Sequence, residues 1–215
     1  MPMSLVLRRL HIERKKFVTS EELKAYCRIA RVKYDTLIRY FETKKYLIRI
    51  FRGIFYVKSA EEIELGRMNL SHLELVARGL DMKKVKNWYF GLHTALKLNN
   101  MTHETFAVEE VISDSLFRAR PIKIADYSFK FVKLSKALLA FGIEKKNELK
   151  YSDPEKTILD FAYLWRYNGY REEKIIADVS EWATGLSAKK LNLYSENYPA
   201  SIKNISKRVV QNEKN

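Results

Sequence analysis

The N-terminal part of the chain places apolar side chains at helical spacing in three short segments. In the first segment, Leu5, Leu7 and Ile12 are assigned to one apolar face. Thr19 and Glu22 have the spacing of a capping box, which marks the start of the second segment. The pattern therefore predicts three helices, over residues 4–16, 20–29 and 33–44.

The third predicted helix has an apolar face and a polar face. Tyr34, Leu37 and Phe41 are three and four residues apart and form its inner stripe. The outer face carries Lys33, Thr36, Arg39, Tyr40 and Thr43. This outer face is the first candidate binding surface.

Two β-like runs follow, over 46–52 and 54–58, and Gly53 between them takes the positive φ of a hairpin turn freely. Three helices followed by a hairpin is the order of a winged helix-turn-helix module, in which a helix enters the major groove and the hairpin lies against the DNA backbone. A module of this kind that serves only protein contacts is the alternative. The order predicts groove contacts by Lys33, Thr36, Arg39 and Tyr40, and phosphate contacts by Arg49 and Arg52.

Beyond residue 59 the pattern changes. A helix is predicted from Ser71 to about Gly79, and period-two alternation within 105–134 predicts several strands in a small sheet. Asp153 and Pro154 form a helix start signal, and more helices follow to the end of the chain. The predicted class is α+β. Its expected domains are a winged helix-turn-helix (1–59), an α/β body with a small sheet (60–167) and C-terminal helices packed on that body (168–215).

Charge is concentrated in the first of these domains. The 215 residues carry 40 Lys and Arg against 26 Asp and Glu, a net charge of +14. Residues 1–59 alone hold 15 basic and 5 acidic side chains. A basic module attached to a nearly balanced one is typical of a polyanion-binding domain on a body with another task. A basic surface that only maintains solubility is the simpler alternative.

Motifs for catalysis are missing from the sequence. It contains no phosphate-binding GxxxxGK[ST] loop, no GxGxxG, no HExxH and no GxSxG, and its four histidines have no ligand spacing. Asp153 and Asp160 could together hold Mg²⁺. The favoured interpretation is that Asp153 caps a helix and Asp160 pairs with Lys156 four residues away. We therefore expect no enzyme, no catalytic residue, no metal and no cofactor.

The expected location is the cytoplasm, with no membrane partner. No run of 18 apolar residues is present, the N-terminal segment lacks the pattern of a signal peptide, and Cys27 is the only cysteine.

Three segments carry a family resemblance. The segment 45–57, with a basic residue and Gly before a Phe-Tyr-Val strand, resembles the hairpin end of AbiEi-type antitoxins. Residues 89–99 are similar to a Gly-x-x-Ala-Leu helix of that family. Tyr151–Asp160 is similar to its Ser-x-Pro-Glu-(Lys/Arg)-Thr-(Leu/Ile)-Leu-Asp signature. The resemblance implies a type IV toxin–antitoxin system linked to phage defence. It further implies that the N-terminal module represses its own operon by binding double-stranded DNA at its promoter, and that the C-terminal region neutralises a nucleotidyltransferase-like toxin.

Two other functions are compatible with the same sequence. One is a ligand-responsive winged-helix regulator, whose second domain senses a small molecule. The other is a metal-dependent enzyme that acts on nucleic acid and uses Asp153 and Asp160 to bind the metal.

Overall fold

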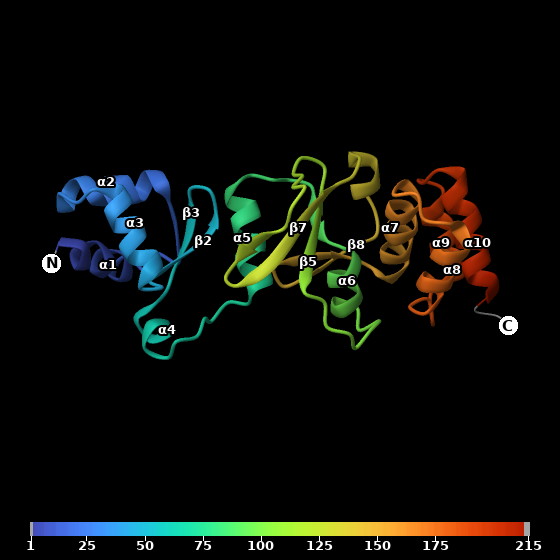
Figure 1. Cartoon of the computed structure of the whole chain (residues 1–215), viewed down its shortest axis with the longest axis horizontal. Coiled ribbons are helices and arrows are strands. Elements are labelled where there is room, and N and C mark those ends of the chain that lie inside the picture. The colour runs from blue at the N-terminus through green and yellow to red at the C-terminus, as the bar shows by residue number, and fades with distance from the viewer. Residues whose placement is uncertain (1, 213–215) are drawn as a thin grey trace. The chain divides into compact units, whose positions relative to one another are not determined.

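The computed structural model describes residues 2–212 and shows an α+β protein (Figure 1). Residues 1 and 213–215, at the ends of the first and last predicted domains, lie outside the described residues. The chain forms two compact units. One comprises Met1–Lys84 with Lys123–Tyr127, and the other comprises Val85–Ile122 with Ser128–Asn215. No helix in the described part of the chain is long and apolar enough to span a membrane.

The first unit begins with three helices and a three-stranded sheet. The helices are α1 (Pro2–Ile12), α2 (Ser20–Ala30) and α3 (Tyr34–Thr43), and the strands are β1 (Phe17–Thr19), β2 (Leu47–Phe51) and β3 (Ile54–Val57). The sheet is antiparallel, with the order β1-β3-β2. Leu10, Leu23, Leu37 and Phe41 have no exposed surface and form the centre of the shared core. Two residues of the predicted inner stripe of α3, Leu37 and Phe41, are thereby confirmed, whereas the third, Tyr34, is half-buried.

The predicted apolar face of the first helix is wrong for two of its three residues, while the third, Leu7, is half-buried and packs against the core. Leu5 and Ile12 are 59% and 71% exposed, whereas Val6 and Leu10 are buried. Val6 and Leu10 are four residues apart, so they lie on one side of the helix, against α2. The helix also ends at Ile12 rather than at 16, because Arg14 has a positive φ of 52°.

The start of α2 and the turn between β2 and β3 lie where the sequence predicts them. Thr19 accepts a hydrogen bond from the Glu22 amide, and the Thr19 amide donates to the Glu22 carboxylate at 2.8 Å, which completes the capping box. Arg31, in the left-handed region, ends α2. Gly53, with a φ of +78°, forms the turn between β2 and β3.

Two more helices complete the first unit, α4 (Ala60–Glu64) and α5 (His72–Met82), so residues 60–84 belong to it. Ser71 is the N-cap of α5, as predicted, but the helix continues past Gly79 to Met82. A Cβ atom at Gly79 would lie 2.6 Å from Ile50 Cγ2 and 2.8 Å from the Phe51 ring. Gly79 therefore permits close packing of α5 on β2 and does not end the helix.

The second unit holds most of a mixed six-stranded sheet with the order β6-β7-β5-β4-β9-β8; residues Lys123–Tyr127 of β6, β7 and their connection are grouped with the first unit. The strands of the sheet are β4 (Trp88–Phe90), β5 (Val108–Ser113), β6 (Ile122–Ile124), β7 (Tyr127–Lys133), β8 (Ile143–Lys146) and β9 (Leu149–Ser152). The pairs β4–β9 and β5–β7 are parallel, and β4–β5 and β8–β9 are antiparallel. The predicted alternation is confirmed on β7, where Phe129 and Phe131 are buried between exposed or half-exposed neighbours.

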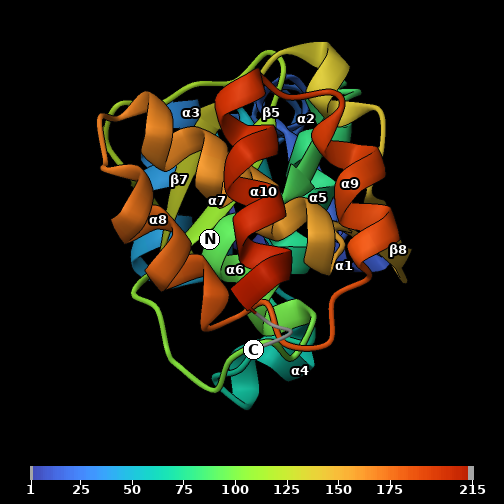
Figure 2. The same cartoon turned by 90° about the vertical axis from the view of Figure 1, so that its right-hand side faces the viewer.

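The helices of this unit pack around α7 (Figure 2). They are α6 (Leu92–Leu98), the short 3-10 helix η1 (Lys136–Leu139), α7 (Pro154–Tyr167), α8 (Glu172–Ser180), α9 (Ala188–Ser195) and α10 (Ala200–Asn212). Helix α7 contacts α6, α8, α9 and α10. Ile202, Ile205 and Val209 of α10 face this core, with at most 2% of each exposed.

Candidate nucleic-acid interface

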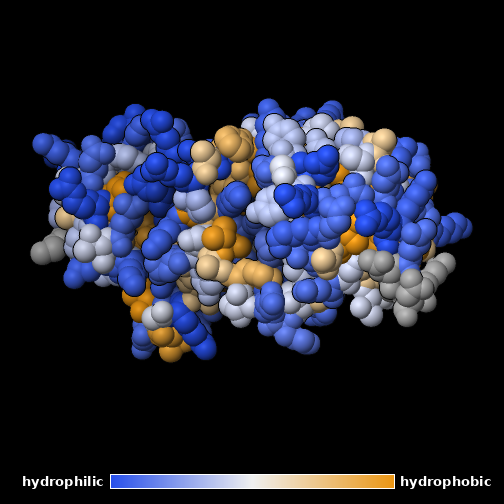
Figure 3. All heavy atoms as spheres, turned by 45° about the vertical axis from the view of Figure 1, so that its right-hand side comes forward, coloured by the Kyte–Doolittle hydropathy of each residue, from blue (hydrophilic) through white to orange (hydrophobic). Residues whose placement is uncertain are grey.

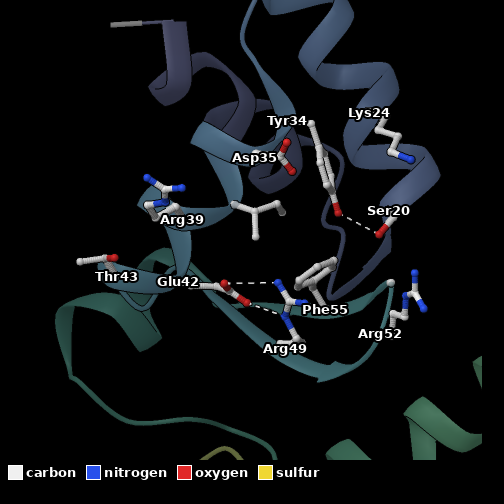
Figure 4. A pocket seen from close by; sticks show the side chains of 12 residues that line it. Ser20, Lys24, Tyr34, Asp35, Arg39, Glu42, Thr43, Arg49, Arg52 and Phe55 are labelled. Carbon is white, nitrogen blue, oxygen red and sulfur yellow. Dashed lines mark hydrogen bonds and ion pairs between the residues drawn. The ribbon is translucent and has the colours of Figure 1, made fainter.

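A concave surface of about 550 Å³ lies in the first unit, between α2, α3 and the β2–β3 hairpin (Figure 4). Three of the predicted contact residues line it together: Arg39 from α3, Arg49 from β2 and Arg52 from the hairpin turn. Lys24 of α2 adds a fourth basic side chain. Residues far apart in sequence thus form one basic face.

Arg39 and Thr43 lie on the exposed side of α3, opposite the buried Leu37 and Phe41. Helical spacing explains this, because residues four apart share a face and positions 37 and 41 are turned toward the core. Arg39 and Arg52 are exposed, and neither forms an ion pair with any described residue. Both guanidinium groups are therefore available to a partner.

The remaining predicted groove residues do not line this concave surface. Lys33, the N-cap of α3, and Thr36 are exposed. Tyr40 is half-buried, with its ring packed edge-on against Tyr46 at a centroid distance of 6.2 Å. Tyr40 thus contributes to packing as well as to the surface of α3.

Arg49 is held by a neighbour within the site. Its Nε donates to Glu42 Oε1 at 2.8 Å and its guanidinium lies 5.2 Å from the centre of the Phe55 ring. The hydrogen bond to Glu42 raises the pKa of Arg49. Glu42 therefore competes with any phosphate for Arg49, so Arg49 is a weaker candidate contact than Arg52.

Two contacts connect Ser20, at the start of α2, to the hairpin and to α3. The Ser20 amide donates to the Gly53 carbonyl at 2.9 Å, and Ser20 Oγ lies 2.8 Å from Tyr34 Oη. Lys24 lies over the Tyr34 ring, 5.5 Å from its centre. Sequence reasoning missed Lys24 and Glu42, because only the packing of α2 and the hairpin on α3 brings them to this face.

The two carboxylates considered for a metal already have protein partners. Asp160 accepts from Tyr89 and Tyr198, each at 2.7 Å, and forms a buried ion pair with Lys156 at 3.1 Å. Asp153 caps α7 by accepting from the Lys156 amide at 2.8 Å. The favoured interpretation of both residues, as a helix cap and an i, i+4 pair, is confirmed. Among the described residues, no three His, Cys, Asp or Glu side chains are grouped to hold a metal.

Hydrophilic side chains cover most of the face seen in Figure 3, and hydrophobic ones form small separate groups. The fold and the basic face define the class: an α+β protein with an exposed arginine surface built from a helix and a hairpin. No protein-family model and no curated protein matches the chain. Its fold is similar to the crystal structure of the RV2827C protein from Mycobacterium tuberculosis, with a TM-score of 0.63 and 14% identity over 99% of this chain and 77% of that one. At this identity the likeness shows a shared fold alone.

Proposed function

We propose that the first unit is a winged helix-turn-helix that binds double-stranded DNA. In this proposal α3 lies in the major groove and the β2–β3 hairpin lies along the phosphate backbone. One observation carries the proposal: Arg39 on the outer side of α3 and Arg52 at the hairpin turn line the same concave face, and both are exposed without an ion-pair partner among the described residues.

The charge of this region supports the same proposal. Residues 1–59 hold 15 basic and 5 acidic side chains, and DNA binding is driven largely by release of counterions from phosphates. An arginine on a groove-facing helix can read guanine, whereas an arginine on a hairpin contacts phosphate regardless of sequence. Arg39 and Arg52 are assigned these two roles.

The cellular role we propose is that of an AbiEi-like antitoxin and transcriptional repressor. It binds its own promoter, represses its operon in the cytoplasm, and neutralises a nucleotidyltransferase-like toxin in phage defence without being an enzyme. The support is the motif Tyr151–Asp160, similar to the family signature, which forms the cap and the buried pair of α7 in the centre of the second unit.

DNA binding is tested by fluorescence anisotropy with two duplexes, the DNA upstream of the gene and a shuffled duplex of equal composition. Arg39→Ala is expected to lose about 1–3 kcal/mol on the upstream DNA and to reduce discrimination between the two duplexes. Arg52→Ala is expected to weaken both equally. A Lys145→Ala/Lys146→Ala variant, altered at exposed positions of β8 in the second unit, is the charge control. If Arg39→Ala binds both duplexes as tightly as wild type does, Arg39 is not a base-reading residue.

The antitoxin role is tested by co-expression with an adjacent nucleotidyltransferase-like gene. Growth is expected to recover with wild type and with Arg39→Ala/Arg52→Ala, because the neutralising activity is assigned to the second unit. If wild type fails to restore growth, the antitoxin role is rejected and the DNA-binding proposal is unaffected.

A further inference from the structure

A second cavity, of about 420 Å³, lies within the second unit, between β5, β7, α6 and α7. This volume falls within the range of roughly 300–1,000 Å³ that is usual for small-molecule sites. Its apolar lining includes Leu92, Phe131 and Phe161, all buried. None of its residues belongs to the basic face of the first unit, so it is a separate site.

Aromatic side chains surround the cavity and are unusually exposed. Phe117 is 65% exposed and Tyr167 is 80% exposed, and both line the cavity together with Trp165. The Trp165 ring is supported by Phe161 at a centroid distance of 5.1 Å. Large aromatic rings are normally buried, and exposed ones beside a cavity offer flat faces for stacking.

Three basic side chains line the same cavity, Arg118, Lys130 and Lys133. All three are exposed, and none has an ion-pair partner among the described residues. The Arg118 amide donates to the Phe131 carbonyl at 3.1 Å, which fixes the 117–119 segment beside β7. Guanidinium and ammonium groups placed in this way suit a phosphate.

One acidic side chain lines the cavity as well. Glu110 is 7% exposed, and its Oε2 accepts from the amide and from the Nδ1 of His93, at 3.1 and 2.9 Å. Its Oε1 accepts no hydrogen bond from the described residues. Leu92, beside it, has a positive φ of 53°, a strained backbone of the kind found at functional sites. Glu110 Oε1 is therefore free of donors from the described residues and can accept a hydrogen bond from an N–H group of a ligand in the cavity.

We propose that this cavity binds a nucleotide. Its base stacks on the aromatic side chains and donates an N–H to Glu110, while its phosphates contact Arg118 and Lys130. A fatty acid has no N–H group to donate to the Glu110 carboxylate, and a free phosphate cannot stack on the aromatic rings. A nucleotide can contact the rings, the basic side chains and the Glu110 carboxylate together. The proposal is independent of DNA binding by the first unit.

The test is isothermal titration calorimetry of the full chain at about 0.15 M salt. The probes are ATP, GTP, CTP and UTP, the matching nucleosides, inorganic triphosphate and decanoate. At least one nucleotide is expected to bind at least about tenfold more tightly than its nucleoside and than triphosphate. The proposal is overturned if no nucleotide binds below about 1 mM, or if triphosphate or decanoate binds as tightly as the best nucleotide.

Variants localise the binding. Arg118→Ala/Lys130→Ala removes two exposed side chains and is expected to weaken the nucleotide by at least about tenfold. The controls Lys145→Ala/Lys146→Ala and Arg39→Ala/Arg52→Ala remove the same charge elsewhere and are expected to bind as wild type does. Equal loss in either control would overturn the site, because binding would then follow net charge alone.

Discussion

The buried carboxylate of Glu62 holds together the segments that connect β3, α4 and α5. It accepts hydrogen bonds from Tyr56 Oη at 2.6 Å, from the Asn69 amide at 2.6 Å and from the Ser59 amide at 2.8 Å. Burial opposes its ionisation, but these hydrogen bonds outweigh burial and lower the pKa of Glu62. Glu62 thus joins the end of β3, the start of α4 and the segment that leads to α5.

Replacing Glu62 by Gln is expected to destabilise the first unit by about 1–3 kcal/mol at pH 7, because at least one buried donor loses its charged acceptor. A carboxyl whose pKa is lowered on folding gives stability above its unfolded value of about 4.3, and this stability is lost as the pH falls through the folded pKa. The difference in stability between wild type and Glu62→Gln should therefore become smaller below about pH 4. Thermal melts from pH 7 to pH 3 measure it, and a gap that is constant with pH would refute this role of Glu62.

Lys156 and Asp160 form a fully buried ion pair in the second unit. The ammonium also lies 3.1 Å from Tyr198 Oη and 4.7 Å from the centre of the Phe141 ring. Burial and the Asp160 charge raise the pKa of Tyr198 well above its usual value, so its hydroxyl stays protonated and donates to Asp160. The pair is therefore surrounded by groups that compensate both charges.

Lys156→Met is expected to cost about 3–5 kcal/mol, because it leaves Asp160 charged and buried without its cation. The double variant Lys156→Met/Asp160→Asn should cost less than Lys156→Met alone, since no uncompensated charge remains. Urea unfolding of both variants tests this. If the double variant is the less stable of the two, the pair is not the dominant interaction at this position.

At the scale of elements, boundaries with a local chemical cause could be predicted. The capping box at Thr19, the N-cap at Ser71 and the Asp153-Pro154 start all mark helices in the structure, because a cap depends on residues close in sequence. The hairpin turn at Gly53 was predictable for the same reason.

Elements stabilised by distant partners could not be predicted. Strand β1 has only three residues, too few to show a period of two, and it exists because it pairs with β3. Strand β8 is largely exposed and polar and is held by β9. The apolar face of α1 was assigned wrongly because Leu5 and Ile12 also fit a helical period.

The candidate interface was predictable only in part. The outward position of Arg39 follows from the inner stripe of α3, and the position of Arg52 follows from the hairpin turn. The ion pair between Glu42 and Arg49 depends on the distance between α3 and β2, which helix periodicity alone does not contain. The cavity in the second unit likewise depends on packing between α7 and the sheet.

Gly79 gives a prediction for helix α5. A glycine inside a helix normally costs about 1 kcal/mol relative to alanine, so Gly→Ala usually stabilises. Here the added Cβ would lie 2.6 Å from Ile50 Cγ2, and Gly79→Ala is expected to destabilise the first unit by about 1–3 kcal/mol. Urea unfolding measures the change. A stabilised variant would show that α5 does not pack closely on β2.

At the scale of the whole molecule, the basic part of the chain lies within one of the two folded units. The basic excess lies in residues 1–59, within the first unit, whereas the second unit holds the capped helix α7 and its buried ion pair. This division supports the proposal that DNA binding and toxin neutralisation belong to different units. Variants of the basic face should therefore lose promoter binding and keep toxin rescue.

The salt dependence of binding to the DNA upstream of the gene tests the central proposal most directly. Each phosphate contact contributes about 0.9 to the slope of log K against log salt concentration. We predict that Arg39→Ala/Arg52→Ala binds at least about tenfold more weakly than wild type, with a slope shallower by about one because the phosphate contact of Arg52 is lost, and that Lys145→Ala/Lys146→Ala keeps the wild-type slope. Equal slopes and affinities for wild type and the Arg39→Ala/Arg52→Ala variant would contradict DNA binding by this face.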